Sequence, residues 1–233
     1  MNNRQPYGPL VNWAPGVWIR DGEWFGSPFR RRMTVIKLEN GKIWIHNPFD
    51  LDSNDVEALR SLGTVSGVLA PNTIHSSDLS TFVSHFPNIQ VFAPKTVARK
   101  VQGALDWNAL PQLKDITWKP VLGTRIDELL LLHKPTRTLI ATDLVFNMPE
   151  NSFKGLEKTI MRWNGIDGQF GPSKIFKFLF VNNRNLFEKS IQETFEYDFD
   201  RILMNHGNPI LSDGKRLWQE GFNHRFGLSE NSI

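Results

Sequence analysis

The sequence has no cysteine among its 233 residues. This absence excludes disulfide bridges, thiolate catalysis, and zinc or iron–sulfur sites built on cysteine. A chain without cysteine also suits a reducing compartment. The first residues, Met1-Asn2-Asn3-Arg4-Gln5, lack the apolar core of a signal peptide. We therefore expect a cytoplasmic protein.

Long apolar runs and dense charge are also scarce. No run approaches the roughly 18 apolar residues that suggest a membrane span, so no membrane partner is expected. The formal net charge is only +3, and Arg30-Arg31-Arg32 is the one dense basic cluster. Lys154, Lys158 and Arg162 would share one stripe of a helix. Such charges favour solvated faces; the alternatives are an anionic substrate or, less favoured, a nucleic-acid backbone.

What the chain does contain is an alternation of strand and helix patterns, which suits one domain over residues 1–233. Asn40-Gly41 between two apolar runs predicts a hairpin. The helix starts are assigned to Asn54 and to Ser76 or Ser77 as N-caps. Strands are expected at 17–19, 33–38, 43–46, 65–70, 90–93, 126–133, 138–142 and 201–204; helices at 52–62, 79–86, 95–101, 151–163, 186–195 and 214–226; and irregular structure at 106–120.

Three of these strands end in a residue that can bind a metal. The strand at 65–70 leads to His75, that at 138–142 to Asp143, and that at 201–204 to His206. In α/β sheets, ligands collect where the carboxyl ends of strands open into loops. Two imidazoles and one carboxylate suit zinc or ferrous iron. Water would fill the remaining positions, and a metal makes water nucleophilic near neutral pH.

At these same residues the sequence resembles a divergent branch of the metallo-β-lactamase superfamily. Thr142-Asp143-Leu144-Val145-Phe146 is similar to the family's bridging-aspartate motif, and Met204-Asn205-His206-Gly207 to its terminal His-Gly motif. The resemblance covers roughly residues 33–209. It implies an α+β fold, a four-layer αβ/βα sandwich. In this fold two mixed sheets pack face to face, helices lie outside them, and a metal site lies at the sheet edge.

The departures from the family pattern concern both metal sites. The two earlier histidines of the family's first motif correspond to Ala70 and Asn72, and no histidine lies in 121–124, so the first site lacks its ligands. The motif's aspartate, a ligand of the second site, corresponds to Ile74. The three-histidine site is therefore absent. The resemblance implies at most one divalent metal, held by His75, Asp143 and His206. Zinc is the first expectation, with iron or manganese as alternatives, and no metal if the site is degenerate.

The resemblance also suggests roles for neighbouring residues. Asp143 would be a ligand and the catalytic residue, whereas Asn72, His46 and Asn205 would orient the ligands by hydrogen bonds. The expected function is a metal-dependent hydrolase acting on a small ester, thioester or phosphoester. The missing aspartate counts against efficient hydrolysis.

Two other interpretations stay open at this point. In one, the three residues are remnants whose imidazoles bond to loop backbone, in a non-catalytic binding or scaffold protein. In the other, the protein handles iron and oxygen. The sequence leaves open the oligomeric state and the roles of residues 106–120 and 152–181.

Overall fold

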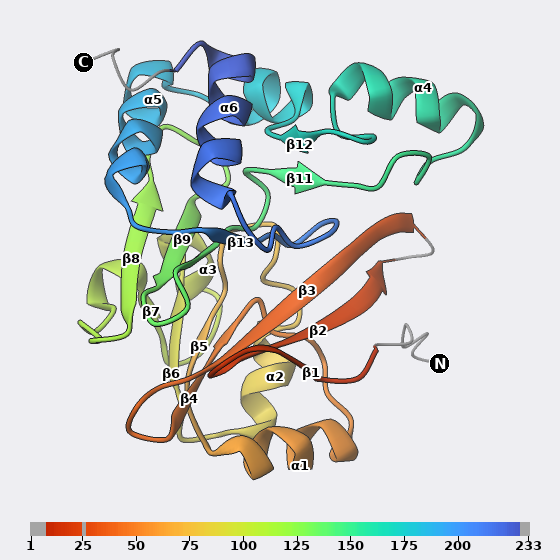
Figure 1. Ribbon diagram of the computed structural model, residues 1–233. Helices are drawn as coiled ribbons and strands as arrows, with labels where there is room; N and C mark the ends of the chain where they lie inside the picture. Colours follow the sequence, from red (N-terminus) through yellow and green to blue (C-terminus); the bar gives the residue numbers. More distant parts are fainter. Residues whose placement is uncertain (1–7, 25–26, 229–233) are drawn as a thin grey trace. The chain divides into compact units, whose positions relative to one another are not determined.

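The computed structural model describes residues 8–24 and 27–228 (Figure 1). The chain divides into two compact units, which are described separately. Unit 1 comprises Met1–Phe25 and Arg31–Asp115, and unit 2 comprises Gly26–Arg30 and Ile116–Ile233. That residues 1–233 form one domain stays a prediction.

Unit 1 is built on a mixed seven-stranded sheet whose strands follow one another in sequence order. The hairpin expected at Asn40-Gly41 joins β3 and β4 as an antiparallel pair, and Gly41 has φ +76° in its turn. From β4 to β7 the strands run parallel, so their carboxyl ends share one edge. The strands are β1 (Val11–Ala14), β2 (Val17–Trp24), β3 (Ser27–Lys37), β4 (Lys42–His46), β5 (Thr64–Leu69), β6 (Gln90–Ala93) and β7 (Ala104–Asp106).

The helices of unit 1 bury their apolar residues in a core shared with these strands. They are α1 (Ser53–Leu62), α2 (Leu79–His85), α3 (Lys95–Ala98) and the 3₁₀ turn η1 (Trp107–Ala109). Leu59 of α1 and Phe82 of α2 lie in one cluster with Val35 and Val68. The N-cap assignments were wrong by a few residues. Asp52 caps α1 in a reciprocal bond pair with Asp55, and Asp78 precedes α2 without a side-chain cap bond.

Unit 2 contains a mixed four-stranded sheet and a small two-stranded one. In the larger sheet the order is β13-β10-β9-β8, with β10 and β13 parallel and the other pairs antiparallel. The prediction of irregular structure through residue 120 was wrong, because β8 forms a strand against the full length of β9. The strands are β8 (Ile116–Val121), β9 (Glu128–His133), β10 (Thr138–Ile140), β11 (Phe146–Asn147), β12 (Phe170–Gly171) and β13 (Arg201–Leu203).

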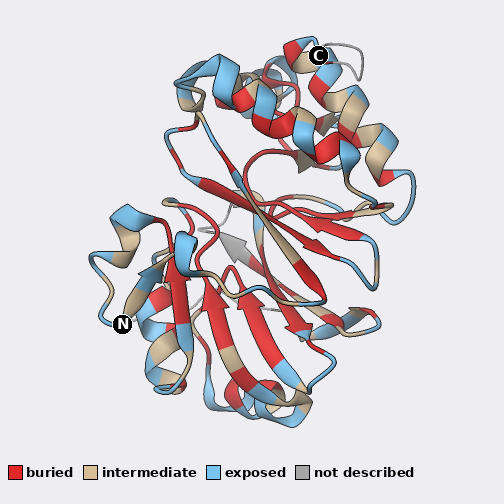
Figure 2. Ribbon diagram, turned by 90° about the vertical axis from the view of Figure 1, so that its left-hand side faces the viewer, coloured by how far each residue is buried: buried red, intermediate tan, exposed pale blue. Residues whose placement is uncertain are grey.

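Helices α5 and α6 of unit 2 pack on the larger sheet. Phe187 and Ile191 of α5, with Trp218 and Phe222 of α6, share a buried cluster with strand residues such as Leu130. Buried residues dominate the strands in Figure 2, whereas helices carry exposed residues on their outer sides. The helical segments are α4 (Gly155–Asn164), the π-helical turn η2 (Phe176–Phe180), α5 (Arg184–Gln192), the 3₁₀ turn η3 (Glu193–Glu196) and α6 (Gly214–Phe226).

Candidate metal centre

Asp143 and His206 meet because two parallel strands end side by side. Ile140 of β10 pairs with Leu203 of β13, and each strand is followed within three residues by its polar side chain. Asp143 Oδ1 lies 3.3 Å from His206 Nε2. Both residues are buried. Two of the three strand-end residues named from the sequence therefore lie side by side in unit 2, and their role as metal ligands stays a prediction.

Glu128 fixes the position of Asp143. One carboxylate oxygen of Glu128 accepts the backbone N–H groups of Thr142 at 2.6 Å and of Asp143 at 3.1 Å. Glu128 is fully buried at the start of β9. Charge-assisted bonds to backbone N–H groups are among the stronger hydrogen bonds in proteins. They hold the turn after β10 in one conformation, and with it the Asp143 side chain.

The orientation of the His206 ring is set by a carbonyl and two aromatic rings. His206 Nδ1–H donates to the backbone carbonyl of Arg30 at 2.6 Å. The Phe146 ring stacks on the imidazole with an interplanar angle of 4°, and Phe29 meets it edge-on at 80°. Because Nδ1 carries the proton in this tautomer, Nε2 carries none and acts as an acceptor. A backbone acceptor commonly fixes the tautomer of metal-ligating histidines in this way.

Gly207, which follows His206, is required by the close approach of residue 147. Its φ is +97°, and a Cβ at this position would lie 2.3 Å from the Asn147 carbonyl oxygen. Asn147 N–H also donates to the His206 carbonyl, and Asn208 N–H to the Asn147 carbonyl. The glycine of the His-Gly pair therefore lets the segment at β11 close over the end of β13.

The chemistry of this pair fits a cation. His206 Nε2 accepts a hydrogen bond from Asn205 Nδ2 at 3.0 Å, and a buried carboxylate oxygen lies 3.3 Å away. Two electron-rich atoms so close, away from water, are stabilised by a positive charge at their common side. Thr142 Oγ1 adds a buried oxygen that has no hydrogen-bond partner within the described part of the chain. We call Glu128, Asp143, Asn205 and His206 the unit 2 cluster.

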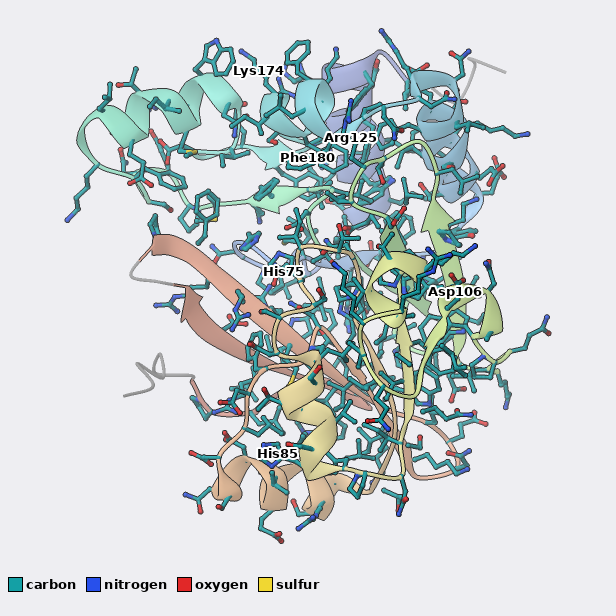
Figure 3. All side chains as sticks on the ribbon, turned by 180° about the vertical axis from the view of Figure 1, so that it is seen from behind. His75, His85, Asp106, Arg125, Lys174 and Phe180 are labelled. Atoms are coloured by element: carbon teal, nitrogen blue, oxygen red, sulfur yellow. The ribbon has the colours of Figure 1, made fainter. Side chains whose placement is uncertain are left out.

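In unit 1, His75 is held by the loop that follows β5. The Asn72 side-chain oxygen accepts the N–H groups of Ile74 at 3.0 Å and His75 at 2.8 Å. This turn, in which an asparagine side chain caps its own downstream backbone, fixes the course of the loop. Asn72 and His75 are buried, whereas Ile74 is 41% exposed. His75 is labelled in Figure 3.

His46, at the end of β4, is buried. Neither ring nitrogen has a hydrogen-bond partner among the described residues. Burial first, and then the charge of nearby His75, lowers the pKa of His46 to about 3. Its imidazole is therefore neutral at physiological pH. We call His46, Asn72 and His75 the unit 1 cluster.

Sequence reasoning missed the supports of the unit 2 cluster. Glu128, the Arg30 carbonyl, and the rings of Phe29 and Phe146 were not predicted. Glu128 left one trace, since it is the acidic residue that opens an otherwise apolar strand, Leu129 to Leu132. The Arg30 carbonyl left none, because any residue has one.

Solved structures with the same arrangement of strands and helices match nearly the whole chain. DIM-1 metallo-β-lactamase matches with a TM-score of 0.63 at 12% identity, over 99% of this chain and 100% of that chain. The mono-zinc form of the metallo-β-lactamase FIM-1 from Pseudomonas aeruginosa matches with a TM-score of 0.56 at 10% identity, over 90% of each chain. This chain has the metallo-β-lactamase fold. The predicted fold class, α+β with two mixed sheets, is confirmed.

A structure of a different kind of protein, a chemotaxis sensor, also matches the chain. The chemotaxis sensor ODP, solved as a peroxy diiron species, matches with a TM-score of 0.59 at 12% identity, over 95% of this chain and 96% of that chain. No protein-family model and no curated protein matches the sequence. Across residues 8–24 and 27–228, no helix combines the length and apolar character needed to cross a bilayer. A cytoplasmic location stays a prediction.

Proposed function

We propose that this protein is a metal-dependent hydrolase with a single metal ion held by His75, Asp143 and His206. The observation that carries the proposal is the buried pair in unit 2. His206 Nε2 and Asp143 Oδ1, 3.3 Å apart, are two acceptors that share a space suited to a cation. His75 is proposed as the third ligand, because its imidazole completes a donor set of the kind that holds a divalent metal.

The donor set narrows the choice of metal. Two imidazole nitrogens and one carboxylate oxygen suit zinc, and also ferrous iron or manganese with less preference. A divalent metal at this position would polarise a carbonyl or phosphoryl oxygen and lower the pKa of water. The substrate class is a small ester, thioester or phosphoester, and the net charge of +3 slightly favours an anionic one.

The protein's own residues supply positioning. Glu128 holds the backbone of Asp143, and the Arg30 carbonyl fixes the tautomer of His206. Asn72 shapes the loop that carries His75. Asp143 is proposed as both ligand and catalytic residue, and Asn72, His46 and Asn205 as the groups that orient or surround the ligands. The similar structure of FIM-1 was solved in a mono-zinc form, which supports the proposal of a single metal in this fold.

Two rival functions remain testable alternatives. A scaffold protein with a degenerate site would also show the bond from His206 to the Arg30 carbonyl, because structural histidines commonly bond to backbone. An iron protein that handles oxygen is favoured by the similarity to ODP, which was solved as a peroxy diiron species.

Calorimetric titration of the metal-free protein with zinc, manganese and ferrous iron tests the proposal. We expect one equivalent to bind, and affinity to fall at least a hundredfold in Asp143→Asn, His75→Gln and His206→Gln. His224→Gln, an exposed helix position, is the matched control and should bind as the wild type does. Hydrolysis of activated esters and phosphoesters by the loaded protein should follow the same order.

The outcomes separate the three functions. A folded wild type that binds none of the metals would overturn the proposal in favour of the scaffold. Binding without turnover of any ester, thioester or phosphoester would retain the metal site and reject the hydrolase. Preference for ferrous iron with oxygen consumption would assign the site to the redox alternative.

A further inference from the structure

Helix α4 and the turn η2 carry large apolar side chains on the outside of unit 2. On α4, Leu156 is 77% exposed, Trp163 60% and Ile160 45%. Steps of four and then three residues place these three on one side of the helix, where they form a stripe. On η2, Phe178 and Leu179 are each more than 60% exposed. Large apolar side chains that gather in one exposed region mark a place of interaction.

A hydrogen bond and a lysine join α4 to the residues just before η2. The side-chain oxygen of Asn164, the last residue of α4, accepts the N–H of Ile175 at 2.8 Å. Lys174 Nζ lies 4.8 Å from the centroid of the Trp163 ring. Figures 1 and 3 show the two helical segments side by side, and Figure 3 labels Lys174 there. The exposed apolar residues and the two lysines between them form what we call the α4–η2 patch: Leu156, Ile160, Trp163, Lys174, Lys177, Phe178 and Leu179.

The two lysines give the α4–η2 patch an uncompensated positive charge. Lys177 Nζ lies 5.8 Å from the centroid of the Phe178 ring and donates to the Arg225 carbonyl at 2.7 Å. Within residues 8–24 and 27–228, neither Lys174 nor Lys177 forms an ion pair with an acidic side chain. Cations that lie beside exposed aromatic rings and have no acidic partner favour an anionic binding partner.

The charged residues of α4 itself lie outside the apolar stripe. At about 100° per residue, Glu157, Lys158 and Arg162 are roughly a quarter-turn or more from its centre. Arg162 is bound to Glu150 at 3.0 Å, and Lys158 donates to Asn151. The charge that an approaching surface meets beside the apolar residues is therefore that of the two lysines.

The size of the patch favours a lipid surface over a folded partner. With about 150–250 Å² for an aromatic side chain and somewhat less for an aliphatic one, the five apolar residues expose on the order of 500 Å². A stable protein interface buries about 800 Å² on each partner. A lipid surface needs no matching area, because apolar side chains enter the boundary between headgroups and acyl chains one by one.

The composition of the patch also suits a lipid surface. Tryptophan is enriched at the interface between membrane and water, and lysine stems lie along apolar groups while their ammonium groups reach the headgroups. Nucleic acid fits less well, because two lysines neutralise few phosphates and the aliphatic side chains of Leu156, Ile160 and Leu179 do not stack on bases.

We propose that the α4–η2 patch docks the protein on the surface of a membrane that contains anionic lipids. The apolar side chains enter the headgroup region, and Lys174 and Lys177 lie against the lipid phosphates. Such a contact is peripheral, whereas the sequence expectation of no membrane partner concerned long apolar runs that span a bilayer. The patch contains none of the proposed metal ligands, so its test does not depend on the hydrolase proposal.

Co-flotation with vesicles tests the role of the lysines. The wild type should float with vesicles of phosphatidylcholine mixed with phosphatidylglycerol and stay behind with phosphatidylcholine alone, and added salt should release it. Lys174→Gln should weaken binding about fivefold, the effect of one lysine near an anionic surface. Lys174→Arg keeps the charge and should bind as the wild type does. Lys134→Gln, an exposed lysine in the turn between β9 and β10, is the matched control and should change nothing.

The apolar residues have their own variants. Trp163→Ser and Ile160→Glu should each weaken binding to the mixed vesicles at least about tenfold. Leu211→Asn is the matched control, because Leu211 is also exposed but precedes the N-terminal end of α6, whereas Lys177 binds the C-terminal end of that helix. The chain has no cysteine, so an environment-sensitive dye can be placed at one position. A dye on Ile160→Cys should report an apolar environment with mixed vesicles, and a dye on Lys158→Cys should not.

The outcomes decide between occupants of the patch. Circular dichroism first establishes that each variant is folded. A wild type that floats with neither kind of vesicle would overturn the proposal, as would equal binding to charged and uncharged vesicles. Binding that survives both Trp163→Ser and Ile160→Glu would place the membrane contact elsewhere. A dimer in light scattering that Ile160→Glu dissociates, without vesicle binding, would assign the patch to a second copy instead.

Discussion

His206 of the unit 2 cluster and His46 of the unit 1 cluster differ in their hydrogen-bond partners. In unit 2 both ring nitrogens of His206 have partners: one donates to the Arg30 carbonyl, and the other lies against Asn205 and Asp143. In unit 1 His46 is buried with neither nitrogen bonded among the described residues, and its pKa is about 3. His206 is held in place by hydrogen bonds, whereas His46 is kept neutral by burial.

The difference indicates where a cation can be held. In unit 2 the carboxyl group of Glu128 accepts two backbone N–H groups and positions a second acidic residue, Asp143, whereas the unit 1 cluster, His46, Asn72 and His75, contains no acidic residue. The sequence resemblance predicts that Ile74 takes the place of the family's aspartate. This asymmetry supports the proposal of one metal centred on the unit 2 cluster.

The largest expected loss of stability comes from adding a side chain at Gly207, next to His206. Gly207→Ala should reduce the free energy of unfolding by about 3 kcal/mol or more, because a Cβ would lie 2.3 Å from the Asn147 carbonyl oxygen at φ +97°. Urea denaturation measures the loss. Gly227→Ala is the matched control, also at positive φ but with open space around the added methyl, and should cost about 1 kcal/mol. Equal losses would mean that backbone strain alone, without the contact to Asn147, explains the requirement for glycine.

Removing the carboxylate behind Asp143 should weaken the unit 2 cluster specifically. Glu128→Ala leaves the N–H groups of Thr142 and Asp143 without their acceptor, at a cost of about 2–3 kcal/mol in stability. Metal affinity should fall tenfold to a hundredfold. Glu128→Gln keeps an acceptor and should recover most of both quantities in calorimetry and denaturation. If Glu128→Gln were as damaged as Glu128→Ala, the hydrogen-bond acceptor would not be the feature that matters.

The burial of His46 should make the free energy of unfolding depend on pH. In the unfolded chain His46 has its ordinary pKa of 6.5 and binds a proton below that pH. In the folded protein its pKa is about 3, so it binds a proton only near pH 3. Stability from this group is therefore complete above 6.5 and falls as the pH drops toward 3. At 1.36 kcal/mol per pH unit, the loss near pH 5 is about 2 kcal/mol. His46→Leu should flatten this part of the curve.

The control for this pH profile is an exposed histidine. Unfolding free energies at about pH 7 and pH 5 should differ as much in His224→Gln as in the wild type, because His224 is exposed at the end of α6. An unchanged slope in His46→Leu would show that other groups cause the acid sensitivity.

The smallest expected effect is on metal affinity, from a substitution that gives unit 1 an acidic residue like that of unit 2. Ile74→Asp adds a carboxylate to unit 1, at little cost in stability because Ile74 is 41% exposed. Zinc or manganese should bind at least tenfold more tightly, about 1.4 kcal/mol. Ile74→Asn has a similar shape without the charge and should bind as the wild type does. Equal affinities for all three proteins would place Ile74 away from the metal.

Local sequence signals predicted most elements of the fold. Asn40-Gly41 made the hairpin between β3 and β4, and apolar periodicity located α1, α2 and α6 within a residue or two of their ends. β8 escaped prediction because tryptophan, lysine and proline interrupt its pattern. Its pairing with β9 overrides that weak propensity.

The sequence by itself determined the strands that lead to His75, Asp143 and His206, because these depend on residue identity and short-range pattern. Only the tertiary structure decided which groups hold Asp143 and His206. The bonds from Glu128 and to the Arg30 carbonyl join segments far apart in the chain. The exposure of α4 was decided there too, because burial depends on what the rest of the fold leaves uncovered.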